Sequence, residues 1–254
     1  MSGARTARLS GLRAQIAALE AGARTLNPVL PFGDPRVDGC LAGGGLALGR
    51  WHELGGEGVE AETAASLAAF TAALARPLAA KGEIVWVLRR DDLFAPGLGL
   101  APERLIQVCV RDEAEALAAL EDALGTVGVA AAVGEVEAVS LTAGRRLQLA
   151  CERHGATGFL IRRRLFGGGG KRPASGSASA SRWKIAPAPS EAAPGEPGLG
   201  PPRWRVELER SRGGRTGGWL MELNEASDDA YPFRVVRDLA DRDLAAEEPF
   251  RRAG

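Results

Sequence analysis

Short apolar runs that alternate with helical patterns constrain the fold of this chain more than any other feature of its sequence. The strand-length runs lie at residues 51–54, 83–88, 105–110, 126–133 and 158–161, and the helical patterns at 60–75, 112–124 and 139–153. Runs that are apolar at nearly every position are typical of strands buried on both faces of a parallel sheet. Strands and helices of these lengths, in this order, predict an α/β fold with a mostly parallel central sheet flanked by helices.

The C-terminal third of the chain has a different pattern, in which apolar and polar residues alternate. Every second position is apolar from Trp204 to Leu208 and again from Trp219 to Leu223, and a Gly-Gly pair lies in the connection. Alternation of this kind with a glycine-containing connection predicts an antiparallel hairpin. Residues 231–236 are predicted to add one more strand, so the sheet is expected to have an antiparallel C-terminal extension.

Residues 167–202 separate the two patterns and are dominated by small residues and proline. Gly, Pro, Ala and Ser occupy 27 of these 36 positions, and such a composition buries too little apolar surface to offset the entropy of ordering. We expect most of this segment to be a flexible loop, interrupted only at residues 182–185. The predicted organisation is an N-terminal amphipathic helix or arm (1–27), an α/β core (28–166), this loop (167–202), antiparallel strands that complete the sheet (203–237) and a charged tail (238–254).

The formal net charge of the chain is zero, but the charges are unevenly distributed. Residues 160–220 hold twelve basic and four acidic side chains, whereas residues 101–140 hold two basic and eight acidic ones. A neutral total argues against a uniformly basic nucleic-acid-binding protein. The basic segment at 160–220 fits either the phosphates of DNA or an acidic protein surface, and the sequence leaves both open.

The turn between the predicted strand at 51–54 and the helix at 60–75 lies where a phosphate-binding loop would be expected. Such a loop requires Gly-x-x-x-x-Gly-Lys-[Ser/Thr]. Counted from Gly56, the chain has Ala61 at the second glycine position, Glu62 at the lysine position and Thr63 at the hydroxyl position. A carboxylate in place of the lysine repels the terminal phosphates. The loop is therefore predicted to be degenerate, with no bound nucleotide and no other cofactor.

No other pattern in the sequence predicts a catalytic or metal site. Glu135 follows the predicted strand at 126–133 one position too late for a metal-binding acid, and this displacement turns it toward the opposite face. His52 and His154 are each expected to be structural, and the three cysteines (Cys40, Cys109 and Cys151) are far apart and are expected to be reduced, buried thiols. No apolar run reaches the roughly 18 residues of a membrane span. We expect a cytoplasmic protein that is not an enzyme and has no membrane contact.

Several segments resemble known families. Residues 30–41 (LPFGDPRVDGCL) and 43–54 (GGGLALGRWHEL) resemble the segment that leads into the nucleotide loop of RecA recombinases. Residues 203–220, together with Ala61-Glu62-Thr63 in the loop and Asp241-Arg242 near the end, are similar to the ImuA family, whose members are RecA-like proteins without a functional nucleotide loop. The resemblance implies a RecA-like fold over about residues 28–165, which resumes in the antiparallel strands.

The ImuA resemblance implies an accessory role in SOS-induced translesion DNA synthesis and mutagenesis. ImuA proteins act with ImuB, an inactive Y-family polymerase homologue, and with an error-prone C-family polymerase, and contact with RecA is also associated with them. The family uses its C-terminal region to contact ImuB, so the expected partner-binding residues are Arg203, Trp204, Arg205, Arg210, Arg212, Arg215 and Trp219. Arg and Trp are enriched among interface anchors, but the two tryptophans fit the core face of a sheet equally well.

Two other functions stay open on the sequence. A RecA-like DNA-dependent ATPase with an atypical nucleotide site would take its cation from a lysine or arginine distant in the chain. A SulA-like inhibitor of cell division would also be RecA-like without a nucleotide loop. Proteins of that second kind are shorter and lack the pattern of residues 203–220, so it ranks last.

Overall fold

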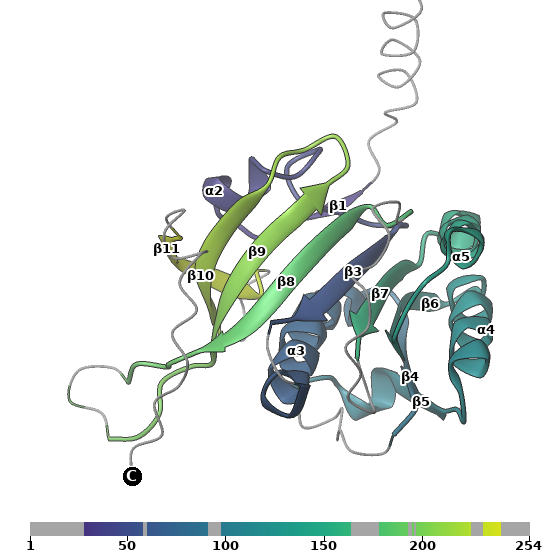
Figure 1. Ribbon diagram of the computed structural model, residues 1–254, viewed down its shortest axis with the longest axis horizontal. Helices are drawn as coiled ribbons and strands as arrows, with labels where there is room; N and C mark the ends of the chain where they lie inside the picture. The colour runs from purple at the N-terminus through teal and green to yellow at the C-terminus, as the bar shows by residue number, and fades with distance from the viewer. Residues whose placement is uncertain are drawn as a thin grey trace, which may run out of the picture.

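The computed structural model describes residues 28–57, 60–90, 98–163, 178–192, 195, 197–224 and 231–239. The helix or arm expected within residues 1–27 and most of the charged tail expected at 238–254 lie outside the described residues. Within them, the α/β core and the C-terminal strands form one continuous sheet (Figure 1).

This sheet has nine described strands, in the order β11-β10-β9-β8-β3-β7-β6-β4-β5. Every neighbouring pair from β8 to β5 is parallel, and β9, β10 and β11 are added antiparallel beyond β8. The strands are β3 (Trp51–Gly56), β4 (Glu83–Leu88), β5 (Leu105–Cys109), β6 (Val129–Val136), β7 (Thr157–Arg162), β8 (Ser181–Ala188), β9 (Arg203–Ser211), β10 (Gly217–Leu223) and β11 (Phe233–Asp238). The predicted mostly parallel sheet with an antiparallel C-terminal extension is confirmed.

Helices cover the two faces of the parallel half differently. α3 (Glu60–Ala75), continued by the 3-10 turn η1 (Arg76–Ala80), packs on one face of β3 and β8. α4 (Glu113–Leu124) and α5 (Leu141–His154) lie side by side on the other face, over β6 and β7 (Figure 1). A second 3-10 turn, η3 (Pro102–Arg104), leads directly into β5.

Local sequence explains where the helices begin and end. The Asp112 side chain accepts the Glu115 N–H at the start of α4, and Ser140 Oγ accepts the Ala143 N–H at the start of α5, which satisfies donors that have no partner inside a helix. Gly155 ends α5 with φ +80°, a left-handed conformation that glycine adopts without strain. Pro77 stands in the 3-10 turn that follows α3.

The segment before β3 folds back on the sheet as a compact lead-in. It contains the antiparallel pair β1 (Val29–Leu30) and β2 (Leu46–Ala47) and the single helical turn α2 (Pro35–Asp38). The Asp38 carboxylate accepts the backbone N–H groups of Phe32 at 2.8 Å and Gly33 at 3.0 Å. The acidic residue of this sequence motif therefore fixes a backbone turn.

The sheet divides the apolar core into two clusters. The larger cluster lies on the α3 face and joins α3, the lead-in and alternate residues of β8 to β11, among them Trp183, Trp204 and Trp219. The smaller cluster lies beneath α4 and α5 and contains Trp51, whose Nε1–H donates to the Gly144 carbonyl oxygen at 3.0 Å. The described part of the outer face of β8–β11, opposite α3, contributes to neither cluster and is mostly polar, with Leu220 and Val236 as exceptions.

The interruption predicted at 182–185 within the flexible loop at 167–202 is a longer strand, so the loop prediction is wrong at residue 181 and at residues 186–188. Residues 181–188 form β8, which pairs in parallel with β3 and antiparallel with β9, and Trp183 and Ile185 are buried. Composition is misleading here because a strand with partners on both edges needs few large side chains to be held. Residues 164–177 lie outside the described part of the chain.

The strand predicted at 126–133 is displaced by three residues, because α4 ends at Leu124 and a turn containing Gly128 at φ +91° comes before the strand. β6 therefore runs from Val129 to Val136, and Glu135 lies inside the strand instead of after it. The prediction of a strand in this region is confirmed, but its predicted bounds, and with them the position of Glu135 after the strand, are wrong.

One stretch of the described residues, Thr63–Ala80, is long and apolar enough to cross a membrane by composition, which contradicts the prediction that no apolar run reaches the length of a membrane span. This stretch comprises most of α3 and the following 3-10 turn. Because 56% of it is buried inside the fold, its apolar character is that of a helix packed on a sheet.

Candidate functional site

The degenerate nucleotide loop lies at the carboxyl edge of the parallel strands, the edge at which open α/β sheets bind ligands. β3 continues to Gly56, two residues beyond the predicted strand, and α3 begins at Glu60. Ala61 and Glu62 belong to the first turn of α3, where a phosphate-binding protein has the second glycine and the lysine.

The backbone just beyond Gly56 continues the sheet. The Glu57 N–H donates to the Ile185 carbonyl oxygen of β8 at 3.0 Å. In a phosphate-binding loop the backbone N–H groups converge on the anion. At Glu57 this donor is used within the fold, so the described part of the loop extends the β3–β8 ladder.

Thr63, which is in register with the hydroxyl that holds magnesium in a working loop, packs against the backbone of the same turn. A methyl group on Gly56 would lie 2.6 Å from Thr63 Oγ1, and Thr63 is buried. The glycine is therefore required by close packing of β3 against α3. Any side chain at position 56 would push strand and helix apart.

The fold brings a lysine to this loop from far along the chain. Lys184 lies on β8 opposite Gly55, and its Nζ forms an ion pair with Glu57 Oε1 and lies 3.7 Å from Glu207 Oε1. Burial lowers the pKa of Lys184, but the hydrogen bond and charge of Glu57, with Glu207 and Glu209, outweigh it and raise the pKa overall. The lysine is charged and already paired with carboxylates.

Glu135, considered in the sequence as a displaced metal-binding acid, is paired with an arginine. Its Oε2 accepts from Arg163 Nη1 at 2.7 Å, and both side chains are buried. Among the described residues no group of three or more His, Cys, Asp and Glu side chains is placed to hold a metal ion. At this position the strand end carries a buried ion pair.

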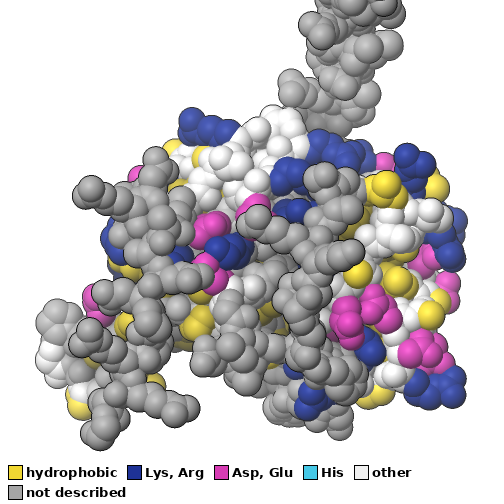
Figure 2. Space-filling view, viewed as in Figure 1, with side chains coloured by type: hydrophobic (Ala, Val, Ile, Leu, Met, Phe, Trp, Pro, Cys, Tyr) yellow, Lys and Arg dark blue, Asp and Glu magenta, His cyan; other side chains and the backbone are white. Residues whose placement is uncertain are grey.

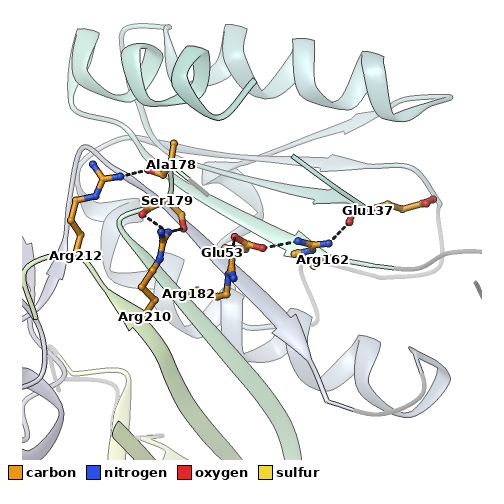
Figure 3. A network of polar contacts seen from close by, with 8 residues as sticks. All are labelled: Glu53, Glu137, Arg162, Ala178, Ser179, Arg182, Arg210 and Arg212. Carbon is orange, nitrogen blue, oxygen red and sulfur yellow. Dashed lines mark hydrogen bonds and ion pairs between the residues drawn. The ribbon is translucent and has the colours of Figure 1, made fainter. Parts of the chain in front are cut away.

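A second and larger charge cluster lies on the opposite face of the sheet, around Glu53 in the middle of β3 (Figure 3). Arg162 Nη1 at the end of β7 donates to Glu53 Oε1 at 2.8 Å, and Arg182 Nε and Nη2 on β8 donate to Oε2 at 3.2 Å each. The Glu53 side chain is 4% exposed, and those of Arg162 and Arg182 are 19% and 18% exposed. One buried carboxylate thus holds two half-buried guanidinium groups.

Two of the predicted partner-binding residues belong to the same cluster. Arg210 Nη2 donates to the carbonyl oxygen and to Oγ of Ser179, at 2.8 and 2.6 Å, and Arg212 Nη2 donates to the Ala178 carbonyl oxygen at 3.1 Å (Figure 3). We call the group of Arg162, Arg182, Arg210 and Arg212 with Glu53 the arginine cluster. Sequence reasoning missed Glu53 and Arg182, and the available signal was a lone carboxylate inside an apolar strand.

The other predicted arginines are separated from this cluster. Arg203 is buried, with Nε 2.7 Å from Glu222 Oε2 and Nη1 2.9 Å from Glu191 Oε2. Arg205 Nη1 lies 3.9 Å from Glu57 Oε2, and exposed Arg215 donates from Nε to Cys40 Sγ at 3.3 Å. The seven residues named from the sequence therefore do not form one patch.

Trp204 and Trp219, for which the sequence left a partner interface and the core face of the sheet equally open, are buried. They are 2% and 3% exposed, on the α3 face of β9 and β10. Trp204 Nε1–H donates to the Ser66 carbonyl oxygen of α3 at 3.0 Å, and the Trp219 ring lies 6.4 Å from that of Trp183. Since α3 and the lead-in cover this face, both tryptophans fill the core, the alternative that the sequence had left open.

His52 is structural, as expected, and holds the start of β8. Its Nε2 lies 2.8 Å from the Ala47 carbonyl oxygen and its Nδ1 lies 2.7 Å from Ser181 Oγ, which also accepts from Trp183 Nε1. A carbonyl oxygen only accepts, so Nε2 carries the proton and Nδ1 accepts from the serine hydroxyl. Complete burial lowers the pKa of His52 to about 4.

This burial predicts a pH-dependent stability. Between about pH 4 and 6.5 the unfolded chain binds a proton at His52 that the folded chain does not, so stability is full above pH 6.5 and falls as the pH approaches 4, by about 3 kcal/mol. Denaturant melts across this range measure the loss. The chain has only two histidines, so NMR titration of both imidazoles is a direct check, with exposed His154 as the internal control. A His52 signal that titrates near pH 6.5 would contradict the prediction.

Comparison with known proteins gives close relatives of one kind. The chain is 61% identical over 244 residues to "Protein ImuA" of two strains of Caulobacter vibrioides, a match that covers 93% of this chain and the whole of each relative. No family model matches the chain. Among solved structures, SulA from Pseudomonas aeruginosa aligns with a TM-score of 0.39 and 23% identity, covering 44% of this chain and 96% of that one.

Proposed function

We propose, from the premise that the chain belongs to the ImuA family, that it is a non-catalytic accessory subunit of an SOS-induced translesion synthesis complex. Family membership supports involvement in damage-induced mutagenesis. In this proposal the protein is a cytoplasmic, RecA-like scaffold that binds an ImuB-type inactive polymerase homologue. RecA and the error-prone C-family polymerase are further partners that the same scaffold would serve.

The geometry of the degenerate loop carries the non-catalytic part of the proposal. The Glu57 N–H is donated to β8, and the Glu57 carboxylate is paired with Lys184, the lysine that the fold brings to the loop. A nucleotide phosphate would have to displace both contacts and approach a carboxylate in a partly desolvated site. Each of these effects opposes nucleotide binding.

The partner-binding part of the proposal is narrowed by burial. Trp204, Trp219 and Arg203 are enclosed in the fold, so the charged side chains that reach the surface near the β9–β10 connection are the remaining candidates. Arg215 is exposed and lies in the connection, four residues after β9 ends at Ser211, whereas half-buried Arg205 lies near the start of β9, away from the connection. We assign the ImuB contact to the β9–β10 connection around Arg215.

One observation favours a second candidate function. Lys184 stands beside the loop as the non-local cation that an atypical DNA-dependent ATPase would need. Release of Glu57 from Lys184 would leave a lysine next to the turn between β3 and α3. We rank this function second because the same lysine also lies 3.7 Å from Glu207.

Calorimetry with Mg-ATP and capture by an immobilised ImuB-type partner test the proposal together. We expect no heat of nucleotide binding up to about 1 mM ATP and specific partner capture. Arg215→Glu is expected to weaken capture about tenfold, the effect of losing one interface anchor, whereas Arg104→Glu, an equal charge change on an exposed side chain before β5, leaves it unchanged. Micromolar ATP binding that Lys184→Ala abolishes would favour the ATPase over the proposed function. If Arg215→Glu captures the partner as well as Arg104→Glu does, the contact does not involve Arg215.

A further inference from the structure

Two arginines face each other directly across neighbouring strands in the arginine cluster. Arg182 of β8 is the antiparallel register partner of Arg210 of β9. Like charges directly opposite one another in a sheet are destabilising. Positions at which a fold keeps a locally unfavourable arrangement are those where function is expected, and an anion bound beside this pair would relieve the repulsion.

A strand irregularity produces the pair. The register of β8 and β9 shifts between Arg182 and Trp183, where Arg182 pairs with Arg210 but Trp183 pairs with Leu208. Glu209 is the extra residue of this bulge. Without it, strict alternation from buried Leu208 would turn Arg210 toward the α3 face, away from Arg182. The bulge therefore aims Arg210 at the polar outer face, beside Arg182 (Figure 3).

The acceptors that position these arginines are mostly neutral. Arg210 is held by Ser179, Arg212 by the Ala178 carbonyl oxygen, and Arg162 in part by the Glu137 carbonyl oxygen. Neutral acceptors hold a guanidinium group in place without cancelling its charge. Within the cluster, Glu53 is the one negative charge beside four arginines. In agreement with this, burial and then the charges of Arg182 and Arg212 lower the pKa of Arg210, and Glu53 offsets them only partly.

The strands that carry the cluster expose no large hydrophobic side chain. Among the described residues, every exposed large hydrophobic side chain lies outside β7, β8 and β9. Lys and Arg side chains gather where β8 begins and β9 ends (Figure 2). Arginine anchors of protein interfaces are accompanied by aromatic and apolar contacts that exclude water, whereas binding to a nucleic-acid backbone relies on positive charge. The observations favour a polyphosphate backbone.

We propose that Arg162, Arg182, Arg210 and Arg212 form a binding site for the phosphate backbone of DNA on the sheet face opposite α3, at the end of β7, the start of β8 and the end of β9. Guanidinium groups bind phosphate oxygens through two parallel N–H donors, and four of them held on one sheet face span neighbouring phosphates. With no exposed aromatic side chain on these strands, bases have no stacking platform. The site is therefore expected to bind DNA by charge and without sequence preference, and to bind single-stranded and duplex DNA alike. This inference does not depend on the ImuB contact.

The test uses the full chain and fluorescence anisotropy of labelled oligo-dT of about 30 nucleotides and of a duplex of the same length, titrated between about 50 and 200 mM salt. Arg212→Gln is expected to reduce the slope of log affinity against log salt by about 0.7 on the single strand and about 0.9 on the duplex, and Arg210→Gln with Arg212→Gln by about twice as much. Arg104→Gln, outside the cluster, is the matched control and is expected to leave the slope unchanged. Because Arg212 is exposed, its variant is expected to keep the parent melting temperature, which separates loss of binding from loss of fold.

Equal slopes for the parent, Arg212→Gln and the double variant would overturn the site. Poly-glutamate that displaces the oligonucleotide at equal concentration of charges would also overturn it, in favour of an acidic protein segment as the natural ligand. A single strand bound far more tightly than the duplex would show that bases are contacted, and the backbone assignment would then be wrong. Each of these outcomes can occur with partner capture intact, so failure here is distinct from failure of the proposed function.

Discussion

Trp204→Ala is expected to lower the free energy of unfolding by about 3–5 kcal/mol, the usual cost of removing a large aromatic side chain from a packed core. Trp204 is 2% exposed, and its ring packs edge-on against Phe70 of α3 at 5.6 Å and Phe233 of β11 at 5.8 Å. It joins the helix to the antiparallel extension, so its loss leaves a cavity between elements that are far apart in sequence. Urea melts followed by far-UV circular dichroism measure the change.

Two variants separate packing from surface chemistry at this position. Trp204→Phe keeps a ring but leaves the Ser66 carbonyl oxygen without its donor, and we expect a cost of about 1–2 kcal/mol. Arg212→Ala, on an exposed side chain after β9, is expected to change stability by about 0.5 kcal/mol or less. If Trp204→Ala is as stable as the parent and loses only partner capture, Trp204 is an interface anchor and its burial against α3 is not the state of the free protein.

The alternation of residues in β9 and β10 was sufficient to predict which side chains share a face, but not what covers that face. Trp204 and Trp219 are placed correctly on one side of the hairpin, and the choice between core and interface depends on α3, more than 120 residues earlier in the chain. The apolar run at 83–88 forms β4, which is buried as its composition predicts. The similar run at 105–110 forms a strand, but its predicted burial is wrong, because β5 is the edge strand of the sheet and Ile106 and Cys109 are exposed. An apolar run therefore predicts a strand, whereas its burial depends on which elements cover it.

β8 and the arginine cluster could not be predicted from local sequence. Residues 181–188 contain two large apolar side chains, Trp183 and Ile185, and the strand exists because β3 and β9 offer it a partner on each edge. Glu53 meets its two arginines across 109 and 129 residues of chain. Such pairs are formed by topology, so a single sequence does not reveal them. The degenerate loop is the opposite case, because the sequence alone shows Glu62 at the lysine position. The structure adds only the contacts of Glu57 with Ile185 and Lys184.

The net charge of zero acquires a spatial meaning in this fold. On the α3 face, the carboxyl edge of the sheet pairs Glu135 with Arg163 in a buried contact. On the outer face, the arginine cluster has a single carboxylate within it, whereas the adjoining stretch of β8 and β9 sets Lys184 and Arg205 against Glu57 and Glu207. The net charge of zero is therefore the sum of a sheet surface that is positive at one end of β8 and neutral at the other.

Glu53→Ala is expected to lower the free energy of unfolding by about 3–5 kcal/mol, because Arg162 and Arg182 would lose the buried carboxylate that compensates their charges. The second variant Arg182→Gln is expected to relieve part of this loss when it is added to Glu53→Ala, because one uncompensated guanidinium is removed. A double-mutant cycle should give a coupling energy of about 0.5–3 kcal/mol between positions 53 and 182. Additive effects of the two substitutions would mean that the ion pair contributes nothing to stability.

The isosteric variant Glu53→Gln connects this prediction with the proposed DNA site, because stability and binding should change in opposite directions. Glutamine keeps an oxygen that accepts from Arg162 or Arg182 but removes the one negative charge among four arginines, so the fold is weakened while the attraction for phosphate grows. We expect a lower urea midpoint together with tighter binding of oligo-dT and of the duplex, and a steeper dependence of affinity on salt. A variant that loses stability and DNA affinity together would show that Glu53 acts by holding the arginines in place, and that their positions matter more than the total charge of the cluster.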